Sequence, residues 1–300
     1  MINMNIIKEI EKLNIGEVLS NIKLKDYTTY KLEGNGYCLV IPDDVNGLIK
    51  LLTFLKEKEI KYKIIGNGSN LIFESDYDGI LIKLDSFQNL NIVGNRIKVG
   101  AGYNLMKLAL RVSRMGLTGL EFATGIPGTI GGAVYMNAGA YKSDMGYVVS
   151  SIKVLNPNLE EEILENKELG FHYRTSFLQQ NPDYICLEAT LYLKKGNPEE
   201  IMEVINDRKQ RRIETQPLEY PSAGSVFRNP EGDFAGRLIE SIGYKGKSIG
   251  DAKVSEKHAN FIINTGHAKG SDIKKLILEI KDKVKEKYNI DLKIEQEFVK

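Results

Sequence analysis

The chain contains 300 residues, of which 42% are hydrophobic and 27% are charged, a composition typical of a globular protein with two or three domains. Its 41 basic and 40 acidic residues leave a net charge of +1, which excludes a general attraction to nucleic acid or to an anionic membrane. Any anionic ligand must therefore be bound by local groups. The three histidines are scattered and the two cysteines lack zinc-binding spacing, so no metal is expected and the thiols are expected to be reduced.

The first half of the chain is predicted to alternate strands and helices. Met1–Ile15 carries charges among its apolar residues, which predicts an amphipathic helix and not a signal peptide and so favours a cytoplasmic location. A second helix is expected after the capping signal Asp43-Asp44, and a third after Asn104. Strands or buried apolar segments are expected at 37–41, 62–65, 79–84, 90–93 and 96–99, the last two as a hairpin.

In the second half, Asn197 and Pro198 indicate the start of a helix and a domain boundary. Further helices are expected at 235–242 and after Ser271, which is predicted to be a helix cap. Between the helix that starts at Pro198 and the helix expected at 235–242, residues 217–230 have the composition of a loop. Strands are expected at 148–155, 161–164, 184–193, 260–264 and 291–299.

The segment 119–141 is rich in glycine and has no charged residue between Glu121 and Lys142. Its proline, asparagine and glycines argue against a membrane-spanning helix and favour a loop that runs into a short helix. Glycine lets backbone N–H groups approach a ligand, and bare N–H groups at a helix start favour a phosphate. We therefore expect a diphosphate-bearing cofactor here, with Gly131 leaving room for it. The alternative is a structural turn between core elements.

A second glycine-rich stretch, 66–71, follows the strand expected at 62–65. A strand that feeds such a turn can direct backbone donors at a phosphate. It is not a dinucleotide-binding fingerprint, because the third glycine of that motif would fall on Leu71. Taken alone, the stretch is equally compatible with a tight turn and with a binding loop.

Four motifs in order, Gly66–Asn70, Gly125–Tyr141, Tyr173–Ser176 and Ala223–Pro230, resemble those of the MurB family of UDP-N-acetylenolpyruvoylglucosamine reductases. The resemblance extends from about Thr28 to Glu297. It implies an α+β fold: an FAD-binding domain of the vanillyl-alcohol oxidase (PCMH) type in two α+β subdomains, and a C-terminal α+β substrate-binding domain. The expected limits are 1–20 for an N-terminal helix, 21–197 for the FAD domain and 198–300 for the substrate domain.

The resemblance implies that FAD lies between the two glycine-rich stretches, and it is expected to be non-covalent because neither stretch contains His or Cys. NADPH is implied as the hydride donor. The residues implied to contact FAD are Gly66, Asn67, Gly68, Ser69, Asn70, Leu71, Thr124, Gly125, Ile126, Pro127, Gly128, Ile130, Gly131, Gly132, Asn137, Gly139 and Ala140.

The family's reaction is reduction of an enolpyruvyl nucleotide sugar to UDP-N-acetylmuramate in peptidoglycan synthesis, a process tied to cell shape and division. Such a reaction requires a cation and a hydrogen-bond donor at the substrate carboxylate and a proton source at the adjacent carbon. The resemblance assigns charge stabilisation to Arg174 and proton donation to Ser225, and it places a catalytic glutamate at Glu297, with Glu295 as the alternative. As isolated residues, Arg174 could equally be an ion-pair partner and Ser225 a capping hydroxyl.

Substrate contacts are expected from Tyr173, Arg212 and Asn229, with Lys245 or Lys247 assisting at the diphosphate. The short interval between Arg174 and Ser225 resembles the family's second type, which lacks a tyrosine-bearing loop over the substrate. The chain departs from the family at position 299, where valine replaces the usual basic residue and Lys300 follows. A monomer is expected, with no nucleic-acid or membrane partner.

Two other functions remain compatible with the motifs. One is an FAD-dependent oxidase of small alcohols or sugars on the same fold, which would have no use for the Ser225 motif. The other is a nucleotide-sugar binding protein that has lost the chemistry, which the presence of Arg174, Ser225 and Glu297 together disfavours.

Overall fold

The computed structural model describes residues 4–300, and its contacts divide the chain into two compact units. Unit 1 comprises the chain up to Leu19, Leu39–Asn67 and Ile80–Gln210; unit 2 comprises Ser20–Cys38, Gly68–Gly79 and Arg211–Lys300. Both units contain helices and strands, as the α+β class requires. The expected limits of the FAD and substrate domains remain a prediction, because a division by contacts does not show which segment binds which ligand.

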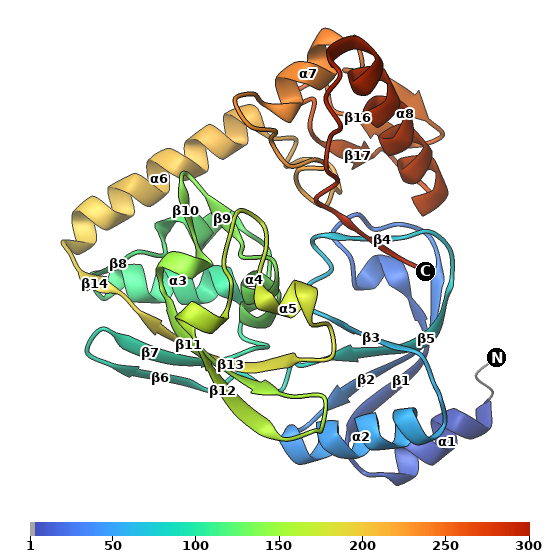
Figure 1. Cartoon of the computed structure of the whole chain (residues 1–300), viewed down its shortest axis with the longest axis vertical. Helices are drawn as coiled ribbons and strands as arrows, with labels where there is room; N and C mark the ends of the chain where they lie inside the picture. The colour runs from blue at the N-terminus through green and yellow to red at the C-terminus, as the bar shows by residue number, and fades with distance from the viewer. Residues whose placement is uncertain (1–3) are drawn as a thin grey trace. The chain divides into compact units, whose positions relative to one another are not determined.

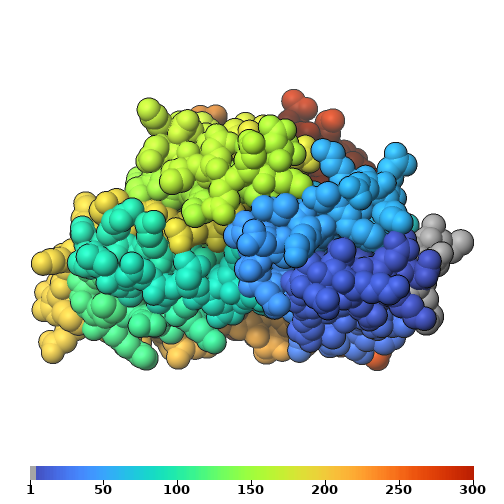
Figure 2. Space-filling model, turned by 90° about the horizontal axis from the view of Figure 1, so that it is seen from below, coloured from blue at the N-terminus to red at the C-terminus, as the bar shows by residue number. Residues whose placement is uncertain are grey.

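The N-terminal part of the chain forms a four-stranded sheet in the order β1-β2-β5-β3. Its strands are β1 (Gly16–Lys23), β2 (Asn35–Pro42), β3 (Tyr62–Ile65) and β5 (Tyr77–Lys83). Helices α1 (Met4–Lys12) and α2 (Val45–Glu57) lie side by side on one face of unit 1, where an ion pair of 2.9 Å joins Lys58 to Glu9 (Figures 1 and 2). The predicted cap of α2 is confirmed, since the Asp44 side chain accepts a hydrogen bond from Gly47 N at 2.8 Å.

Unit 1 contains a five-stranded antiparallel sheet in the order β12-β11-β13-β7-β6 (Figure 1). Its strands are β6 (Leu90–Val93), β7 (Arg96–Gly100), β11 (Val149–Leu155), β12 (Glu161–Glu165) and β13 (Ile185–Tyr192), which confirms the predicted set. Helix α4 (Ile130–Tyr135) packs against β13 and β7. Strand β13, at the centre of this sheet, thereby supports the helix that forms part of the longer glycine-rich stretch.

The remaining elements of the segment Ile80–Gln210 belong to unit 1, and the last of them, helix α6 (Pro198–Thr215), continues past Gln210 into unit 2. Helix α3 (Leu105–Arg114) begins where predicted, with the Asn104 side chain accepting from Lys107 N at 2.9 Å. Helix α6 begins where Asn197 Oδ1 accepts from Glu199 N at 2.9 Å, which confirms that cap too. Shorter elements are β8 (Leu117–Thr118), β9 (Gly139–Ala140), β10 (Ser143–Asp144), α5 (Phe177–Gln180) and β14 (Lys194–Lys195).

Unit 2 is built on a three-stranded sheet, β15 (Ser248–Ile249), β16 (Ala252–Val254) and β17 (Ile262–Asn264), of which β15 and β16 contact helix α8 (Gly270–Tyr288). Helix α7 (Ala235–Ser241) packs on α8, and β4 (Leu71–Phe73) pairs in parallel with β18 (Glu297–Val299). Tyr30, Leu32 and Ile72 are buried in the same hydrophobic core as residues of α7 and α8. This shared core explains why two short N-terminal segments belong to unit 2.

Two predictions for unit 2 are wrong. Ser271 is not the cap of α8, because the helix begins at Gly270 and Lys269 occupies the N-cap position. A Cβ at residue 270 would collide with Phe73 O, so the helix start is fixed by close packing on β4. The strand expected at 291–299 is also too long, since only Glu297–Val299 forms a strand and the preceding residues make irregular contacts.

Candidate active site

The longer glycine-rich stretch forms a loop and then α4, as predicted, but the expected bare N–H groups are not found at the helix start. Ile130 N donates to Tyr103 O at 2.9 Å, Gly131 N to Ala101 O at 2.8 Å, and Gly132 N to the Thr129 hydroxyl at 3.3 Å. These donors are used in packing α4 onto its own unit. The phosphate-binding mechanism expected for them is therefore wrong, although contact of this segment with FAD remains a prediction.

The glycines of this stretch differ in whether an added Cβ atom would meet other atoms of the chain. At Gly131 a Cβ would lie 3.1 Å from Ala101 Cβ, so close packing within the chain explains this glycine and corrects the expectation that it leaves room for a ligand. At Gly128, by contrast, a Cβ would meet no heavy atom within 4 Å among the described residues, and its φ is not left-handed. Neither backbone conformation nor packing requires glycine at 128, which fits a surface shaped for a bound group.

The two glycine-rich stretches meet inside unit 1. A Cβ at Gly66 would lie 2.7 Å from the Thr129 hydroxyl oxygen, so the absence of a side chain lets the first stretch lie against the cap of α4. Gly66 and Asn67 belong to unit 1, whereas 68–71 belongs to unit 2. Gly68 has a left-handed φ of 62°, and a Cβ there would collide with Tyr27 O.

Asn137 has a structural role that its motif did not reveal. Its side chain is 1% exposed, Nδ2 donates to His172 O at 2.8 Å, and Oδ1 accepts from Gly146 N at 2.9 Å. The amide thus joins the end of α4 to the segment that carries Arg174. These bonds give Asn137 a structural role within unit 1, and its contact with FAD remains a prediction.

Arg174 occupies the tip of a tight turn in unit 1. His172 and Thr175 exchange two main-chain hydrogen bonds of 3.0 and 3.1 Å across it, and Arg174 has a φ of 55°, in the region that favours glycine and asparagine. Its Nη2 donates to Gly139 O at 2.7 Å, and its guanidinium carbon lies 5.2 Å from the ring centroid of Tyr173. The turn therefore carries an arginine in a conformation that disfavours one.

Ser225 lies in unit 2 on the predicted loop, whose backbone is held on two sides. On one side Asn260 binds Phe227 through both atoms of its amide, at 2.8 and 2.9 Å, and its own carbonyl accepts from Val226 N at 2.9 Å. On the other side Glu295 N donates to Val226 O at 2.8 Å. Within residues 4–300 the Ser225 hydroxyl makes no hydrogen bond. It is therefore not a capping hydroxyl, although the loop around it is fixed.

Glu297 begins β18 in unit 2, and its N–H donates to Asn70 O at 2.9 Å. Asn70 also binds Glu295 O through its side chain, at 3.1 Å. The chain bends at Gln296 between the two glutamates. The expectation that Glu295 and Glu297 point the same way is thus unsupported, because alternation applies only along a regular strand.

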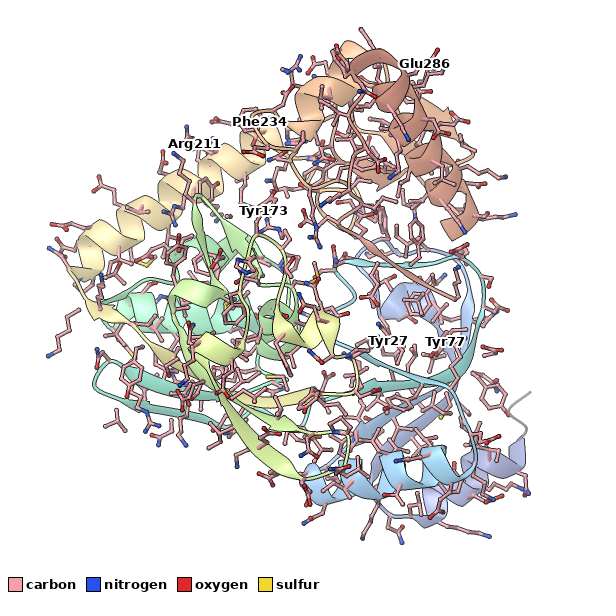
Figure 3. The ribbon with its side chains drawn as sticks, in the orientation of Figure 1. Tyr27, Tyr77, Tyr173, Arg211, Phe234 and Glu286 are labelled. Carbon is pink, nitrogen blue, oxygen red and sulfur yellow. The ribbon has the colours of Figure 1, made fainter. Side chains whose placement is uncertain are left out.

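The residues expected to contact the substrate come from different elements of the chain. Tyr173, labelled in Figure 3, is half exposed, and Asn229 Oδ1 accepts from Ala235 N at 3.0 Å, at the start of α7. Arg212 lies in α6. Lys245 pairs with Glu240 at 2.8 Å, so it is already engaged within unit 2.

The structure brings together some of the predicted residues. In unit 1 it places Arg174 against Gly139, and in unit 2 it places the backbone of the Ser225 loop beside the segment leading to Glu297. Sequence reasoning missed Asn260, Gln296 and Tyr30, which hold that loop and that segment. Only the position of Gln296, next to Glu297, could have drawn notice. The described residues contain no helix long and apolar enough to cross a membrane.

Comparisons with known proteins agree with this architecture. Residues 37–160 match the family model of an FAD binding domain, and with the α+β fold they define an FAD-dependent oxidoreductase. Residues 216–299 match the model for the C-terminal domain of UDP-N-acetylenolpyruvoylglucosamine reductase. The chain is 44% identical over 296 residues to the UDP-N-acetylenolpyruvoylglucosamine reductase of Halalkalibacterium halodurans, and 42% identical to that of Bacillus subtilis, each covering 98% of both chains. The chain belongs to this family of reductases.

A solved structure supports the fold at full length. The crystal structure of UDP-N-acetylenolpyruvylglucosamine reductase (MurB) from Thermus caldophilus superposes with a TM-score of 0.80 at 35% identity. The match covers 95% of this chain and 98% of that chain. The fold class expected from the sequence, an FAD-binding domain of the vanillyl-alcohol oxidase type with a C-terminal α+β domain, is confirmed.

Gly128 offers a direct test of the FAD surface. Gly128→Val should weaken FAD binding about 10- to 100-fold, because forcing methyl groups against a packed partner costs about 1–3 kcal/mol. FAD titration of the apoprotein measures the affinity, and thermal unfolding of the apoprotein should be unchanged. Gly131→Ala is the matched control: its Cβ would press on Ala101, so it should lower the unfolding temperature of the apoprotein. Parent-like FAD affinity in Gly128→Val would show that this position does not face the cofactor.

Proposed function

We propose that this chain reduces the enolpyruvyl ether of UDP-N-acetylglucosamine to UDP-N-acetylmuramate, with NADPH as hydride donor, in cytoplasmic peptidoglycan synthesis. The family membership supports the reaction class. The observation that carries the residue assignment is the Ser225 hydroxyl, which has no hydrogen bond within residues 4–300 although the backbone around it is held from two sides. A hydroxyl placed in this way is available to a ligand and has a fixed direction of approach.

In this proposal bound FAD would supply the hydride chemistry, taking the hydride from NADPH and delivering it to the methylene carbon of the substrate, while the residues of the chain orient the substrate and supply charge and a proton. Ser225 donates a proton to the adjacent carbon. A serine hydroxyl is a poor acid in water, but it can protonate a strongly basic, carbanion-like carbon at which it is already directed. Hydride addition breaks the C=C π bond and leaves its electron pair on the adjacent carbon and its carboxylate; a C–H bond then forms at that carbon as the serine O–H bond breaks, and the serine oxygen regains a proton from solvent.

Arg174 stabilises the negative charge that develops on the substrate carboxylate. A guanidinium presents two parallel donors to a carboxylate, which a point charge cannot reproduce. The conformation of Arg174 supports this role, because a left-handed φ costs an arginine about 1–2 kcal/mol that glycine would not incur. An arginine at this position, despite the free-energy cost of its backbone conformation, indicates that its guanidinium group is required.

Glu297 is assigned the third catalytic position, in the segment that also holds the Ser225 loop. Its place at the first residue of β18 fixes its backbone, and the bend at Gln296 separates its direction from that of Glu295. We assign 21–197 to the FAD domain and 198–300 to the substrate domain. Tyr173, Arg212 and Asn229 are proposed to contact the nucleotide sugar, and the protein is proposed to act as a monomer.

The test of this function is an absorbance experiment on the purified holoenzyme without oxygen. NADPH should bleach the visible flavin band, and the enolpyruvyl substrate should restore it with one equivalent consumed. Reoxidation by oxygen alone, with no response to the substrate, would indicate an oxidase. Binding of the substrate without any reoxidation would indicate a protein that has kept the fold and lost the chemistry.

A further inference from the structure

The C-terminal segment changes partner at Gln296. Before it, Glu295 N donates to Val226 O in the Ser225 loop; after it, Glu297 pairs with Leu71 in β4. Gln296 lies at the bend between these two sets of contacts. Its position therefore links the backbone that carries Ser225 to the backbone that carries Glu297, all within unit 2.

The Gln296 side chain occupies this junction fully. It is 4% exposed, and Nε2 donates to Ala223 O at 3.0 Å and to Gly224 O at 3.2 Å. Oε1 accepts from the Tyr30 hydroxyl at 3.1 Å. Both donors of the amide are thus used on the two residues that precede Ser225.

The orientation of this amide is determined by its partners. The carbonyl oxygens of Ala223 and Gly224 can only accept hydrogen bonds, so the amide nitrogen Nε2, and not the oxygen Oε1, must face them. Tyr30 is completely buried, and burial raises the pKa of its hydroxyl, which keeps it a neutral donor to Oε1. The three bonds are mutually consistent, and water has little access to replace any of them.

The loop needs such a support at this point. Gly224 has a left-handed φ of 72°, while a Cβ there would meet no heavy atom within 4 Å in the described part of the chain. Its glycine therefore serves conformation and not packing. Other contacts hold the loop at Pro221, whose oxygen accepts from Asn264 N at 2.9 Å, at Ser225, which forms a β-bridge with Phe261, and at Val226 and Phe227, which bind Asn260. The side-chain bonds of Gln296 are made to Ala223 and Gly224, between the contacts at Pro221 and Ser225.

We infer that Gln296 is a positioning residue for proton transfer: its amide fixes the backbone before Ser225 and so aims the serine hydroxyl, while its own backbone sets the start of Glu297. This inference rests on the proposed role of Ser225. It assigns no chemical step to Gln296, whose amide carries no titrating proton.

Gln296→Asn tests the inference because asparagine keeps the amide group on a side chain that is one methylene shorter. A displacement of about 1 Å at a reacting group can cost about 100-fold, so we expect substrate-driven flavin reoxidation to slow about 10- to 100-fold. Flavin reduction by NADPH should stay within about threefold of the parent. The solvent isotope effect on reoxidation should rise, because a misaimed hydroxyl makes proton transfer limiting. Equal slowing of both halves, or no slowing of reoxidation, would overturn the inference.

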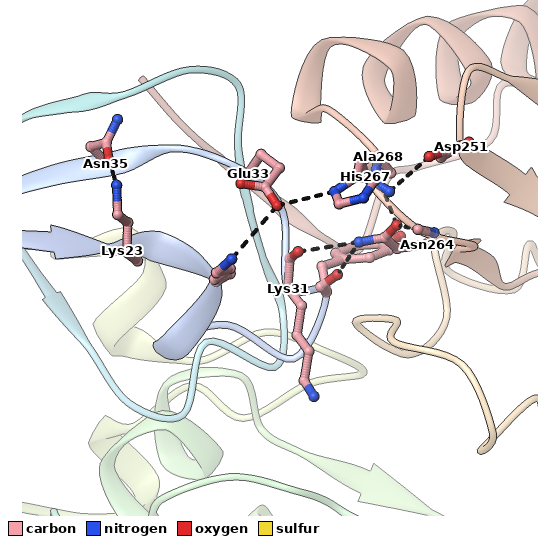
Figure 4. A network of polar contacts seen from close by, with 11 residues as sticks. Lys23, Lys31, Glu33, Asn35, Asp251, Asn264, His267 and Ala268 are labelled. Atoms are coloured by element: carbon pink, nitrogen blue, oxygen red, sulfur yellow. Dashed lines mark hydrogen bonds and ion pairs between the residues drawn. The ribbon is translucent and has the colours of Figure 1, made fainter.

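Asn264 provides a matched control for lost buried hydrogen bonds. It is 3% exposed in the same unit, and its amide binds Tyr30 O, Lys31 O, Gly266 N and Ala268 N at 2.9–3.2 Å (Figure 4). None of these side-chain bonds is to the Ser225 loop, and the main-chain bond from Asn264 N to Pro221 O of that loop is kept when the side chain changes. Asn264→Ser should lower the unfolding temperature as Gln296→Asn does, yet leave the ratio of the two half-reaction rates unchanged. A shifted ratio in Asn264→Ser would show that the effect is one of general destabilisation.

A double variant separates this inference from the proposed function. If Gln296 acts through Ser225, Ser225→Ala with Gln296→Asn should reoxidise no more slowly than Ser225→Ala alone, because the two changes remove the same step. Multiplying effects would overturn the positioning role. If Ser225→Ala by itself leaves the rate of reoxidation unchanged, the proposed role of Ser225 is wrong independently of the result for Gln296. Should Gln296→Asn not fold, Gln296→Met removes the two donors at a similar side-chain length without adding a charge, with the same expected selectivity.

Discussion

Ser225→Ala should slow substrate-driven reoxidation of the flavin by about 10²–10⁴-fold, the range typical of a lost general acid. The alanine removes one hydroxyl and adds no bulk. Because that hydroxyl makes no hydrogen bond within residues 4–300, the fold and the FAD content should be those of the parent. Flavin reduction by NADPH requires only that the cofactor is correctly placed, so this half should keep its rate. Rapid-reaction absorbance of the flavin measures both halves on the same protein.

The control for this prediction is Ser222→Ala, three positions earlier in the same loop. It also removes one hydroxyl from the loop, and both half-reactions should remain as in the parent. The proton-donor assignment is wrong if Ser225→Ala slows NADPH reduction as much as reoxidation, since the serine would then position the cofactor. It is equally wrong if Ser225→Ala turns over normally.

Arg174→Lys should slow reoxidation by about 10- to 100-fold, because hydrogen bonds to charged groups are worth about 1.5–3 kcal/mol and lysine cannot reproduce the guanidinium fork. The positive charge is kept, so the effect measures geometry more than charge. Arg174→Asn should slow reoxidation further while staying close to the parent in thermal stability, because the better tolerance of asparagine for a φ of 55° offsets the lost hydrogen bond to Gly139 O. Unfolding temperature and the two half-reaction rates together check this pair.

Arg208→Lys is a suitable comparison for Arg174. The Arg208 guanidinium carbon lies 4.8 Å from the ring centroid of Tyr141, much as that of Arg174 lies against Tyr173, and both pairs belong to unit 1. Arg208→Lys should leave the half-reactions unchanged. If Arg174→Lys behaves like Arg208→Lys, then Arg174 is a structural cation and another group must meet the substrate carboxylate.

Features that depend on neighbouring residues could be predicted from the sequence. Asp44, Asn104 and Asn197 were predicted as helix caps and make those hydrogen bonds, because a cap side chain reaches only two or three residues along the chain. The strands of the five-stranded sheet followed equally from apolar patterns bounded by turns. The four ordered motifs identified the family, and the comparisons confirmed it.

Helix starts and strand ends that depend on a distant segment could not be predicted from the sequence and emerge from the packing of the folded chain. The start of α8 at Gly270 is set by Phe73, almost two hundred positions away, and no local signal outweighs a collision with that carbonyl. The N–H groups of Ile130 and Gly131 looked available in the sequence, yet Tyr103 and Ala101 satisfy them. Gln296 meets Tyr30 and Gly224 for the same reason: buried polar groups must find partners, and the partners are chosen by packing and not by sequence distance.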